Sequence, residues 1–227
     1  MGNKINDPIA RLMGLRYKSH PWHGIEVGEN APNEVTAFIE IVPTDTVKYE
    51  LDKVSGYIKI DRPQKYSNVV PALYGFVPQS FCGESVARYS MEHSDRTNIV
   101  GDGDPLDICV LTERDISHGD IIVNARPIGG FRILDGNEAD DKIIAVLSHD
   151  VTYSQYNDIS ELPRGIFDRL KHYFLTYKDM PTENENEKRK IELIDTYGRE
   201  EAYEIINRSL EDYKCHFDLL DDILRQV

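Results

Sequence analysis

The chain has 227 residues and a formal net charge of −14 at pH 7, from 40 Asp or Glu and 26 Lys or Arg. This acidic balance argues against nucleic acid as a partner, because binding a duplex depends on Lys and Arg that neutralise its phosphates. No apolar run approaches the roughly 18 residues that cross a bilayer, and the N-terminal residues contain no signal-peptide core, so we expect a soluble, cytoplasmic protein without a membrane partner.

Residues 1–34 form a polar N-terminal segment punctuated by Pro and Gly. From Val35 onward, apolar and polar residues alternate in short stretches, which is the pattern of half-buried strands. Short strands at this spacing, with few helical patterns between them, are typical of a closed or partly closed β-barrel, which we expect over residues 35–150. The predicted strands are VTAFIEIVP, TVKYELD, SGYIKIDRP, LYGFVPQ, LDICVLT, DIIVNARPIGGFRIL and KIIAVLS.

The last part of the chain, residues 151–227, changes to a helical period. Apolar residues recur every four positions from Leu162 to Phe174, which predicts an amphipathic helix over about 160–178. A second apolar stripe predicts a helix over about 199–225, and the charged stretch PTENENEKRK connects the two. Strands followed by helices indicate an α+β fold, and the length fits a single domain over residues 1–227.

A first acidic cluster, Asp102, Asp104 and Asp107, falls within the stretch GDGDPLD at the start of a predicted strand. One interpretation is a polar turn, because Asp, Gly and Pro are the usual turn residues. A calcium loop of the EF-hand type is excluded by spacing, since such a loop needs Asp or Asn at its fifth position and Gly at its sixth. Counting from Asp102, the sequence has Leu106 and Asp107 there.

A second acidic cluster, Asp135, Glu138, Asp140 and Asp141, lies within the eight positions from Asp135 to Lys142, at the start of another apolar strand. Two such clusters at strand ends could face each other across the rim of a barrel. Their carboxylates would then repel one another and would be hard to keep ionised without a hard cation such as Mg²⁺. The two clusters together therefore favour a metal site over a simple polar turn.

Basic and phenolic residues accompany the carboxylates along the chain. Lys48 and Glu50 project from one face of their predicted strand. Arg62 follows Ile58 and Ile60 on the nominally apolar face of the next strand, where an anion site would explain a charge, although a side chain that simply reaches solvent is a common alternative.

In chain order, these residues resemble the soluble family I inorganic pyrophosphatases over most of the chain. The most specific motif is DGDPLD, and further matches are IEI, KYELD, DRP, LYGFVPQ, DGNEADDKIIAV and YKD. The resemblance implies an OB-like closed barrel of mostly antiparallel strands with two flanking C-terminal helices. It also implies Mg²⁺-dependent hydrolysis of pyrophosphate to two phosphates, with Mn²⁺ as a possible substitute, in a protein that forms homo-oligomers.

The resemblance carries metal-binding roles to five carboxylates. Asp102, Asp107 and Asp140 would hold the activating metal pair, and Asp107 would be shared by both ions. Asp135 together with Asp140 would hold the ion that arrives with the substrate. Glu40 would act through the water shell of a further ion.

The remaining roles concern the proton and the phosphates. Asp104 corresponds to the general base, and Glu50 to a supporting carboxylate. The residues that would grip the phosphates are Lys48, Arg62, Tyr74, Lys142, Tyr177 and Lys178. The chemistry requires such groups, because water near pH 7 is a poor nucleophile and the transferring phosphoryl group is strongly anionic.

The sequence departs from the family pattern at three places. Val70 stands where many members have a tyrosine, and Gly136 replaces an acidic residue that often follows the first Asp of the second cluster. The stretch SFCGESVARYSMEHSDRTNIV is longer than in compact bacterial members, and we expect it to form a loop or hairpin beside the site.

Two other classes of function remain open at the level of sequence. One is a non-catalytic module on the same barrel that binds phosphate or a nucleotide with a divalent ion. The other is an acidic interaction protein that uses the charged stretches near its helices. The first would tolerate Asn at position 104, whereas an enzyme that uses Asp104 as its base would not.

Overall fold

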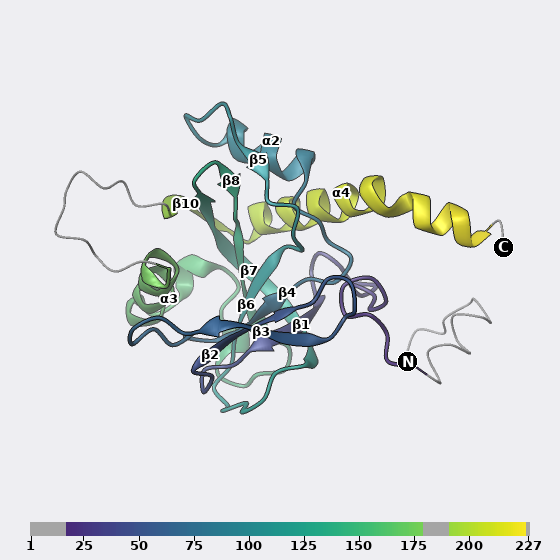
Figure 1. Cartoon of the computed structure of the whole chain (residues 1–227). Coiled ribbons are helices and arrows are strands. Elements are labelled where there is room, and N and C mark those ends of the chain that lie inside the picture. Colours follow the sequence, from purple (N-terminus) through teal and green to yellow (C-terminus); the bar gives the residue numbers. More distant parts are fainter. Residues whose placement is uncertain (1–16, 179–190, 226–227) are drawn as a thin grey trace.

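The computed structural model describes residues 17–178 and 191–225, with side chains placed for 17–178 and 191–217. Ten strands and three α-helices are assigned within these ranges, and the strands lie in one large mixed sheet and one small antiparallel sheet (Figure 1). The predicted α+β class is therefore confirmed. No helix within the described ranges combines the length and apolar character that a membrane span requires.

Five strands of the large sheet close into a ring. Strand β1 (Val35–Ile41) pairs with both β4 (Leu73–Phe76) and β7 (Ile121–Asp135). The ring continues through β6 (Asp107–Leu111) and β9 (Lys142–Leu147), which returns to β7. Only the β6–β9 pairing within this ring is parallel. As a result, Asp107 at the start of β6 lies directly opposite Lys142 at the start of β9.

The longest strand, β7, extends beyond the ring and carries further strands on its second half. There it pairs with β8 (Glu138–Ala139) and with β10 (Ile191–Gly198), and β8 in turn pairs in parallel with β5 (Val100–Gly101). The hairpin of β2 (Val47–Leu51) and β3 (Ile58–Pro63) forms the small sheet.

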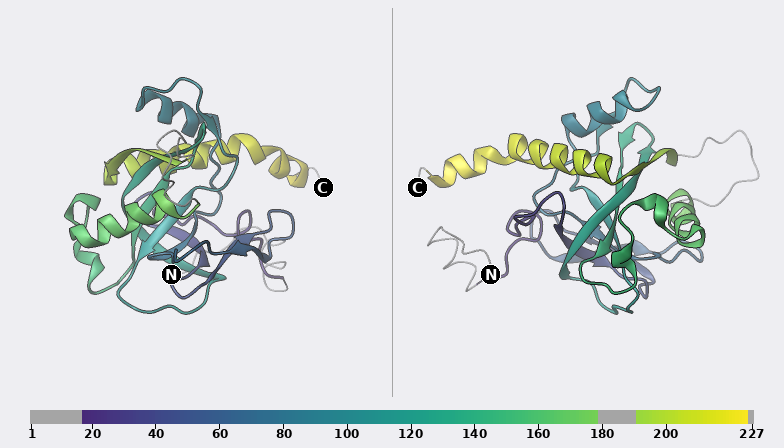
Figure 2. Two further views of the ribbon diagram at one scale, coloured as in Figure 1. Left: turned by 60° about the vertical axis from the view of Figure 1, so that its left-hand side comes forward. Right: turned by 180° about the vertical axis from the view of Figure 1, so that it is seen from behind.

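Helices α3 (Arg164–Thr176) and α4 (Arg199–Arg225) cover different faces of the ring, as the views from the side and from behind show (Figure 2). Strand side chains alternate between the two packing layers. Ile144 and Val146 of β9 join the cluster under α3, whereas Ile143 and Ala145 join the cluster under α4. Burial of both faces explains why β9 is a continuous apolar run.

Both helices predicted from the apolar stripes are confirmed. Leu170 and Phe174 of α3 are fully buried, and so are Ala202 and Ile206 of α4. Amphipathic stripes of this kind direct one side of a helix to the core. The side chains of the last stripe residues, Leu220 and Leu224, and the connection PTENENEKRK lie outside the residues described at that level.

The expectation of a loop or hairpin around residues 80–100 is wrong, because this stretch contains helix α2 (Glu84–Glu92) followed by β5. The N-terminus of α2 is capped from a distant helix. The Asp212 carboxylate of α4 accepts hydrogen bonds of 3.0 to 3.1 Å from the backbone N–H groups of Gly83, Ser85 and Val86. Such a cap satisfies backbone donors that would otherwise be unpaired, and no local pattern reveals it.

Strand β10 was likewise not predicted, because residues 191–198 fall in the part of the chain expected to be helical. Its partner is the extended half of β7, and one irregularity in register lies between Leu193 and Asp195. Half-buried residues dominate β10. Its strand conformation therefore depends on pairing with β7 more than on its own composition.

Candidate active site

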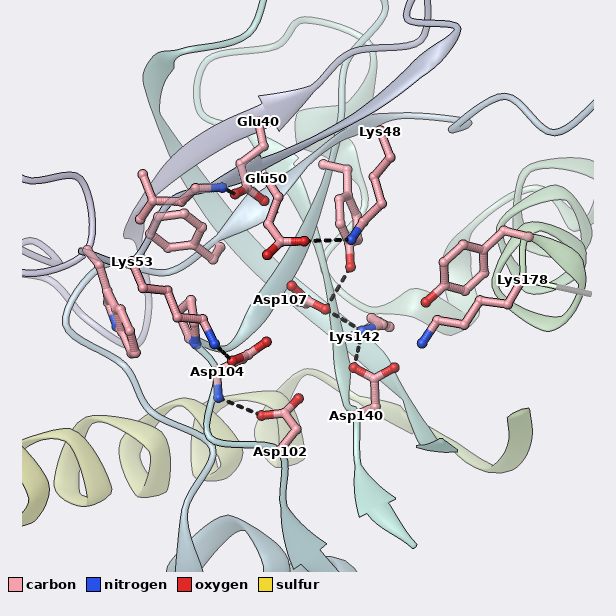
Figure 3. A pocket seen from close by; sticks show the side chains of 16 residues that line it. Glu40, Lys48, Glu50, Lys53, Asp102, Asp104, Asp107, Asp140, Lys142 and Lys178 are labelled. Atoms are coloured by element: carbon pink, nitrogen blue, oxygen red, sulfur yellow. Dashed lines mark hydrogen bonds and ion pairs between the residues drawn. The ribbon is translucent and has the colours of Figure 1, made fainter. Parts of the chain in front are cut away.

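A cleft of about 150 Å³ opens between the rim of the ring and the β2–β3 hairpin (Figure 3). Strands, loops and the end of α3 all contribute side chains to it. The residues that line the cleft are Trp22, Glu40, Lys48, Glu50, Leu51, Lys53, Tyr74, Phe76, Asp102, Asp104, Pro105, Asp107, Asp140, Lys142, Tyr177 and Lys178. Eleven of the thirteen site residues predicted from the sequence are in this set, and the two that are not are Arg62 and Asp135.

The first acidic cluster lies on the loop between β5 and β6 and on the first residue of β6, Asp107. Gly103 has a φ of +73°, a conformation that favours glycine. The backbone N–H of Asp104 donates a 2.8 Å hydrogen bond to Asp102 Oδ1, and the backbone N–H of Cys82 donates one of 2.8 Å to the Asp104 carbonyl oxygen. The loop is therefore fixed at both its side chains and its backbone, and its three carboxylates line the cleft.

Lys142 links the two acidic clusters. Its ammonium contacts Asp107 Oδ2 and Asp140 Oδ1, and its side chain is only 2% exposed. Burial alone would lower the pKa of Lys142, but Asp107 and Asp140 outweigh it and raise this pKa well above its ordinary value. Tyr74 donates a 2.6 Å hydrogen bond to the same Asp107 oxygen.

Two carboxylates of the cleft are held in an environment that disfavours their charge. Burial raises the pKa of Glu40 to about 8, although the backbone N–H of Leu51 opposes this by donating a 2.6 Å hydrogen bond to Glu40 Oε1. Burial, with repulsion from Asp140 and Asp107, raises the pKa of Asp102 to about 8. Such shifts concentrate at functional sites, where like charges are held close together.

The β2–β3 hairpin supplies a layer of alternating charges above the cleft. Lys48 Nζ lies 3.2 Å from Glu50 Oε2 and 3.0 Å from Asp61 Oδ2. Arg62 lies opposite Lys48 in the hairpin and contacts Asp61 at 2.6 Å, and neither Arg62 nor Asp61 lines the cleft. The prediction that Ile58, Ile60 and Arg62 share an apolar face of β3 is wrong at Ile60, because this side chain is 64% exposed.

Tyr177 and Lys178 follow α3 and enter the cleft from the opposite side. Lys178 Nζ contacts Asp135 Oδ2 at 2.5 Å, at the end of β7. The structure thus brings Asp135 to the edge of the cleft through Lys178, and burial raises the pKa of Tyr177. These residues, distant in sequence, meet because α3 packs beside the ring.

Trp22 and Lys53 belong to the cleft but were not predicted from the sequence. The Trp22 indole donates a 2.7 Å hydrogen bond to the Ser80 carbonyl oxygen, which fixes the ring at the wall of the cleft. The Lys53 ammonium contacts Asp104 Oδ1 and lies 5.9 Å from the centre of the Trp22 ring. The stretch KYELDK, next to predicted residues, was the only available signal for Lys53.

The donor set of the cleft fits hard divalent cations. Six carboxylates line it, against four lysines, so carboxylates are the most numerous charged groups of the lining. The carboxylates are Glu40, Glu50, Asp102, Asp104, Asp107 and Asp140. Within the described ranges no three Asp, Glu, His or Cys side chains are already gathered around one metal position, and the ammonium of Lys142 stands between two of the candidate ligands. Carboxylate oxygens are nevertheless the ligands that Mg²⁺ prefers.

The two positions that depart from the family pattern have local explanations. Val70 is fully buried in the apolar cluster that contains Tyr74, so it packs where a hydroxyl would need a partner. Gly136 has a φ of +68° in the turn between β7 and β8, which favours glycine over an acidic residue.

Comparison of the sequence with known proteins points to one family. The sequence profile of the family described as Inorganic pyrophosphatase matches residues 37–214. The Inorganic pyrophosphatase of Chlamydia trachomatis serovar L2 is 52% identical over 196 residues, which cover 86% of this chain and 94% of that protein. The Soluble inorganic pyrophosphatase 2 of Chlamydomonas reinhardtii is 38% identical over 199 residues, covering 88% of this chain and 91% of that protein.

The fold leads to the same family. The crystal structure of inorganic pyrophosphatase from Thermus thermophilus superposes with a TM-score of 0.68 at 29% sequence identity, over 86% of this chain and 99% of that one. The resemblance inferred from the motifs is therefore confirmed, and this chain belongs to the inorganic pyrophosphatase family.

Proposed function

We propose that this protein hydrolyses inorganic pyrophosphate to two orthophosphates in the cleft, with Mg²⁺ as its cofactor. The observation that carries the proposal is the convergence of Asp102, Asp104, Asp107 and Asp140 with Lys142 in one cleft, in a chain that belongs to the pyrophosphatase family. Mn²⁺, which also prefers oxygen ligands, is a candidate substitute.

The carboxylates divide into binding roles for the metal. Asp102, Asp107 and Asp140 would hold the activating ions, with Asp107 shared, and Asp135 with Asp140 would hold the ion that arrives with the substrate. Glu40, behind this group, would act through coordinated water. When bound, Mg²⁺ lowers the pKa of water from about 16 towards neutrality and neutralises phosphate charge.

Asp104 is the candidate general base. It is half exposed in the cleft, and its backbone is held at both sides by the hydrogen bonds of the loop. A carboxylate in such a place can accept the proton of the attacking water or orient that water. Glu50 supports the arrangement by fixing Lys48.

The cationic and phenolic groups bind the phosphates from three sides. Lys48 comes from the hairpin, Lys142 from the ring and Lys178 from the end of α3, so together they can surround a compact dianionic group. Tyr74 and Tyr177 donate hydrogen bonds without adding charge. Positive charge and donors of this kind stabilise the transferring and leaving phosphates, which is the main source of catalysis in phosphoryl transfer. Arg62 would complete the grip through a bidentate contact.

We also propose the barrel type, domain organisation, location and oligomeric state of the protein. We infer that the five-stranded ring is an OB-like barrel in one domain over residues 1–227. We also infer that the protein acts in the cytoplasm and forms homo-oligomers, as the family resemblance implies. The formal charge of −14 supports a small metal-bound anion as its partner in place of nucleic acid.

Phosphate release from pyrophosphate, measured with Mg²⁺ and again with a chelator, tests the proposed function. We expect rapid release only with Mg²⁺. A folded protein that binds Mg²⁺ and pyrophosphate without releasing phosphate would contradict hydrolysis and would favour the non-catalytic binding module.

A further inference from the structure

The loop between β3 and β4, residues 64–72, lies against the C-terminal end of helix α3. Lys65 Nζ donates a 2.6 Å hydrogen bond to the carbonyl oxygen of Lys178. The side-chain amide of Asn68 donates one of 3.2 Å to the carbonyl oxygen of Thr176, the last residue of α3. The last carbonyl groups of an α-helix have no partner within it and carry partial negative charge, so they favour donors and cations. The loop therefore caps α3 from a distant part of the chain.

This loop is itself fixed at both of its ends. The backbone N–H of Gln64 donates a 2.9 Å hydrogen bond to the carbonyl oxygen of Thr46, just before β2. Val70 is fully buried in the apolar cluster under α3. Between these points, the backbone N–H of Asn68 donates a 3.2 Å hydrogen bond to the carbonyl oxygen of Lys65, which closes a turn. The two capping side chains thus come from the two ends of one turn.

The turn contains a strained residue. Tyr66 has a φ of +55°, a left-handed conformation that residues other than glycine rarely adopt. Its side chain is 61% exposed, so packing of the ring in the core does not account for the conformation. Strain of this kind persists only where the surrounding contacts impose it. The hydrogen bonds of Lys65 and Asn68 to the end of α3, on either side of Tyr66, are such contacts.

The capped end of α3 carries two of the predicted phosphate-binding residues. Tyr177 and Lys178 line the cleft, and the loop binds the carbonyl group of Lys178 and that of Thr176, directly before Tyr177. On the helix side, the backbone N–H of Tyr177 donates a 2.9 Å hydrogen bond to the Tyr173 carbonyl oxygen, and the two rings stack with their centres 5.3 Å apart. Contacts within α3 therefore hold Tyr177 from one side, and the loop holds this segment from the other.

The loop also joins two walls of the cleft. It follows β3, in which Arg62 lies opposite Lys48 of β2. Lys48 and Lys178 enter the cleft from different sides (Figure 3). The hairpin and the end of α3 thus present their cations from separate elements, and the hydrogen bonds of the loop connect these elements directly.

We propose that Lys65 and Asn68 are positioning residues, which tie the end of α3 to the β2–β3 hairpin and thereby hold Tyr177 and Lys178 in the geometry that binds pyrophosphate. The proposal rests on the proposed function, because it takes Tyr177 and Lys178 as phosphate ligands. It goes further in that neither Lys65 nor Asn68 lines the cleft. Without the two caps, the ligand itself must order the end of α3 when it binds, and its apparent affinity falls accordingly.

The test uses Lys65→Met, Asn68→Ala and the double variant in the full chain. Calorimetry at saturating Mg²⁺ measures the affinity for imidodiphosphate, an analogue of pyrophosphate that resists hydrolysis. We expect Kd to rise about threefold for each single variant and about tenfold for the double variant, since each change removes one hydrogen bond. KM for pyrophosphate should rise in the same proportion. The value of kcat should fall by less than about threefold, because bound substrate orders the end of α3 again.

Two conservative variants separate positioning from general damage. Lys65→Arg keeps a donor and a positive charge beside the Lys178 carbonyl group, so its affinity should stay within about twofold of wild type. Asn68→Asp puts a carboxylate against the Thr176 carbonyl oxygen, at the negative end of the helix dipole. It should therefore weaken imidodiphosphate binding more than Asn68→Ala does.

Asn157→Ala is the matched control. The side-chain amide of Asn157 also donates a 3.2 Å hydrogen bond to a backbone carbonyl oxygen, that of Gln155, but Asn157 does not line the cleft. Its replacement should leave Kd and KM unchanged. Hydrogen exchange followed by mass spectrometry is the second readout. Amides in the last turn of α3 should exchange faster in the double variant than in the wild type or in Asn157→Ala.

Wild-type affinity in the folded double variant would overturn the proposal, even if the end of α3 exchanged faster, because the loop would then stabilise the helix without positioning its phosphate ligands. Equal weakening by Asn157→Ala, or by Lys65→Arg and Lys65→Met, would also overturn it. If the double variant does not fold, Asn68→Ala and Asn68→Asp decide, and wild-type affinity in both would refute the idea. Failure of the proposed function is distinguishable, because the wild-type protein would then release no phosphate from pyrophosphate.

Discussion

Tyr74 donates a 2.6 Å hydrogen bond to Asp107 Oδ2, the same oxygen that the ammonium of Lys142 contacts. Sheet register produces this meeting. Tyr74 is on β4, which pairs with β6, and Asp107 at the start of β6 lies directly opposite Lys142 in β9. The Asp107 carboxylate is therefore oriented by two neighbouring strands before any ion or substrate binds. Burial, together with the charge of Asp107, raises the pKa of Tyr74 well above its ordinary value, which keeps this hydroxyl a donor.

Replacement of Lys142 by Met should destabilise the metal-free protein by about 3–5 kcal/mol, because it leaves Asp107 and Asp140 without their shared cation. Urea unfolding with and without Mg²⁺ measures this, and Mg²⁺ should recover part of the loss. The control is Lys59→Met on the hairpin, whose half-exposed ammonium lies 4.0 Å from Glu50 and 3.6 Å from Asp52 and should contribute less than about 1 kcal/mol. Equal losses for both variants would be evidence against the buried role of Lys142.

Leu170→Ala should lower the free energy of unfolding by about 2–5 kcal/mol, since Leu170 is fully buried between α3 and the ring and its truncation leaves a cavity. Urea titration followed by circular dichroism gives the value. Lys171→Ala, at the exposed next position of the helix, should change it by no more than about 0.5 kcal/mol. A small loss at Leu170 would mean that α3 does not pack on the ring as described.

His23 should make the protein sensitive to acid. Burial, with the nearby charge of His20, lowers the pKa of His23 from its ordinary value to about 4. The unfolded chain therefore binds a proton on His23 between about pH 6.5 and 4 while the folded chain does not, so stability must fall as the pH falls through that window. His23→Gln, which can still bond to the Tyr213 hydroxyl, should flatten the dependence of the urea midpoint on pH. An unchanged dependence would show that other groups cause it.

Trp22 is the only tryptophan in the chain and lines the cleft, so its fluorescence should report events there. Titration with Mg²⁺ and then with imidodiphosphate, a hydrolysis-resistant analogue of pyrophosphate, should change the emission in a saturable manner, because the charge near the ring changes when ligands bind. Trp22→Phe should remove the signal without removing binding in a calorimeter. Binding by calorimetry with constant Trp22 emission would place the ligands elsewhere.

Much of the fold could be predicted because its patterns are local. Short alternating or continuous apolar stretches indicated the strands, and apolar residues spaced by about four positions indicated α3 and α4. Eleven acidic, basic and phenolic residues that line the cleft could be identified because they occur in fixed order along the family motifs. The motifs did not predict that Arg62 contacts Asp61 and that Asp135 contacts Lys178, because a family motif places a residue near a site without specifying which neighbour it contacts.

The features that could not be predicted depend on distant partners. Helix α2 is capped by Asp212, more than 120 residues away in the chain, and β10 is a strand because β7 offers it a partner. Trp22 enters the cleft from the polar N-terminal segment, which carried no pattern. Arginine is usually a surface residue. Only the assembled structure shows that Arg132, on an apolar strand, is buried near two tyrosines and the Glu201 carboxylate.

The most direct test of the account concerns Asp104, the middle carboxylate of GDGDPLD. At saturating Mg²⁺ and pyrophosphate, Asp104→Asn should lower the turnover number by about 10²–10⁴-fold, the range that a general base contributes. Its affinity for imidodiphosphate should stay within about threefold of wild type. Asp120→Asn serves as the control, because Asp120 is equally exposed and also pairs with a lysine, but lies outside the cleft. Turnover of Asp104→Asn equal to that of the wild type and of Asp120→Asn would contradict the assignment of the proton-accepting group on which the mechanism depends.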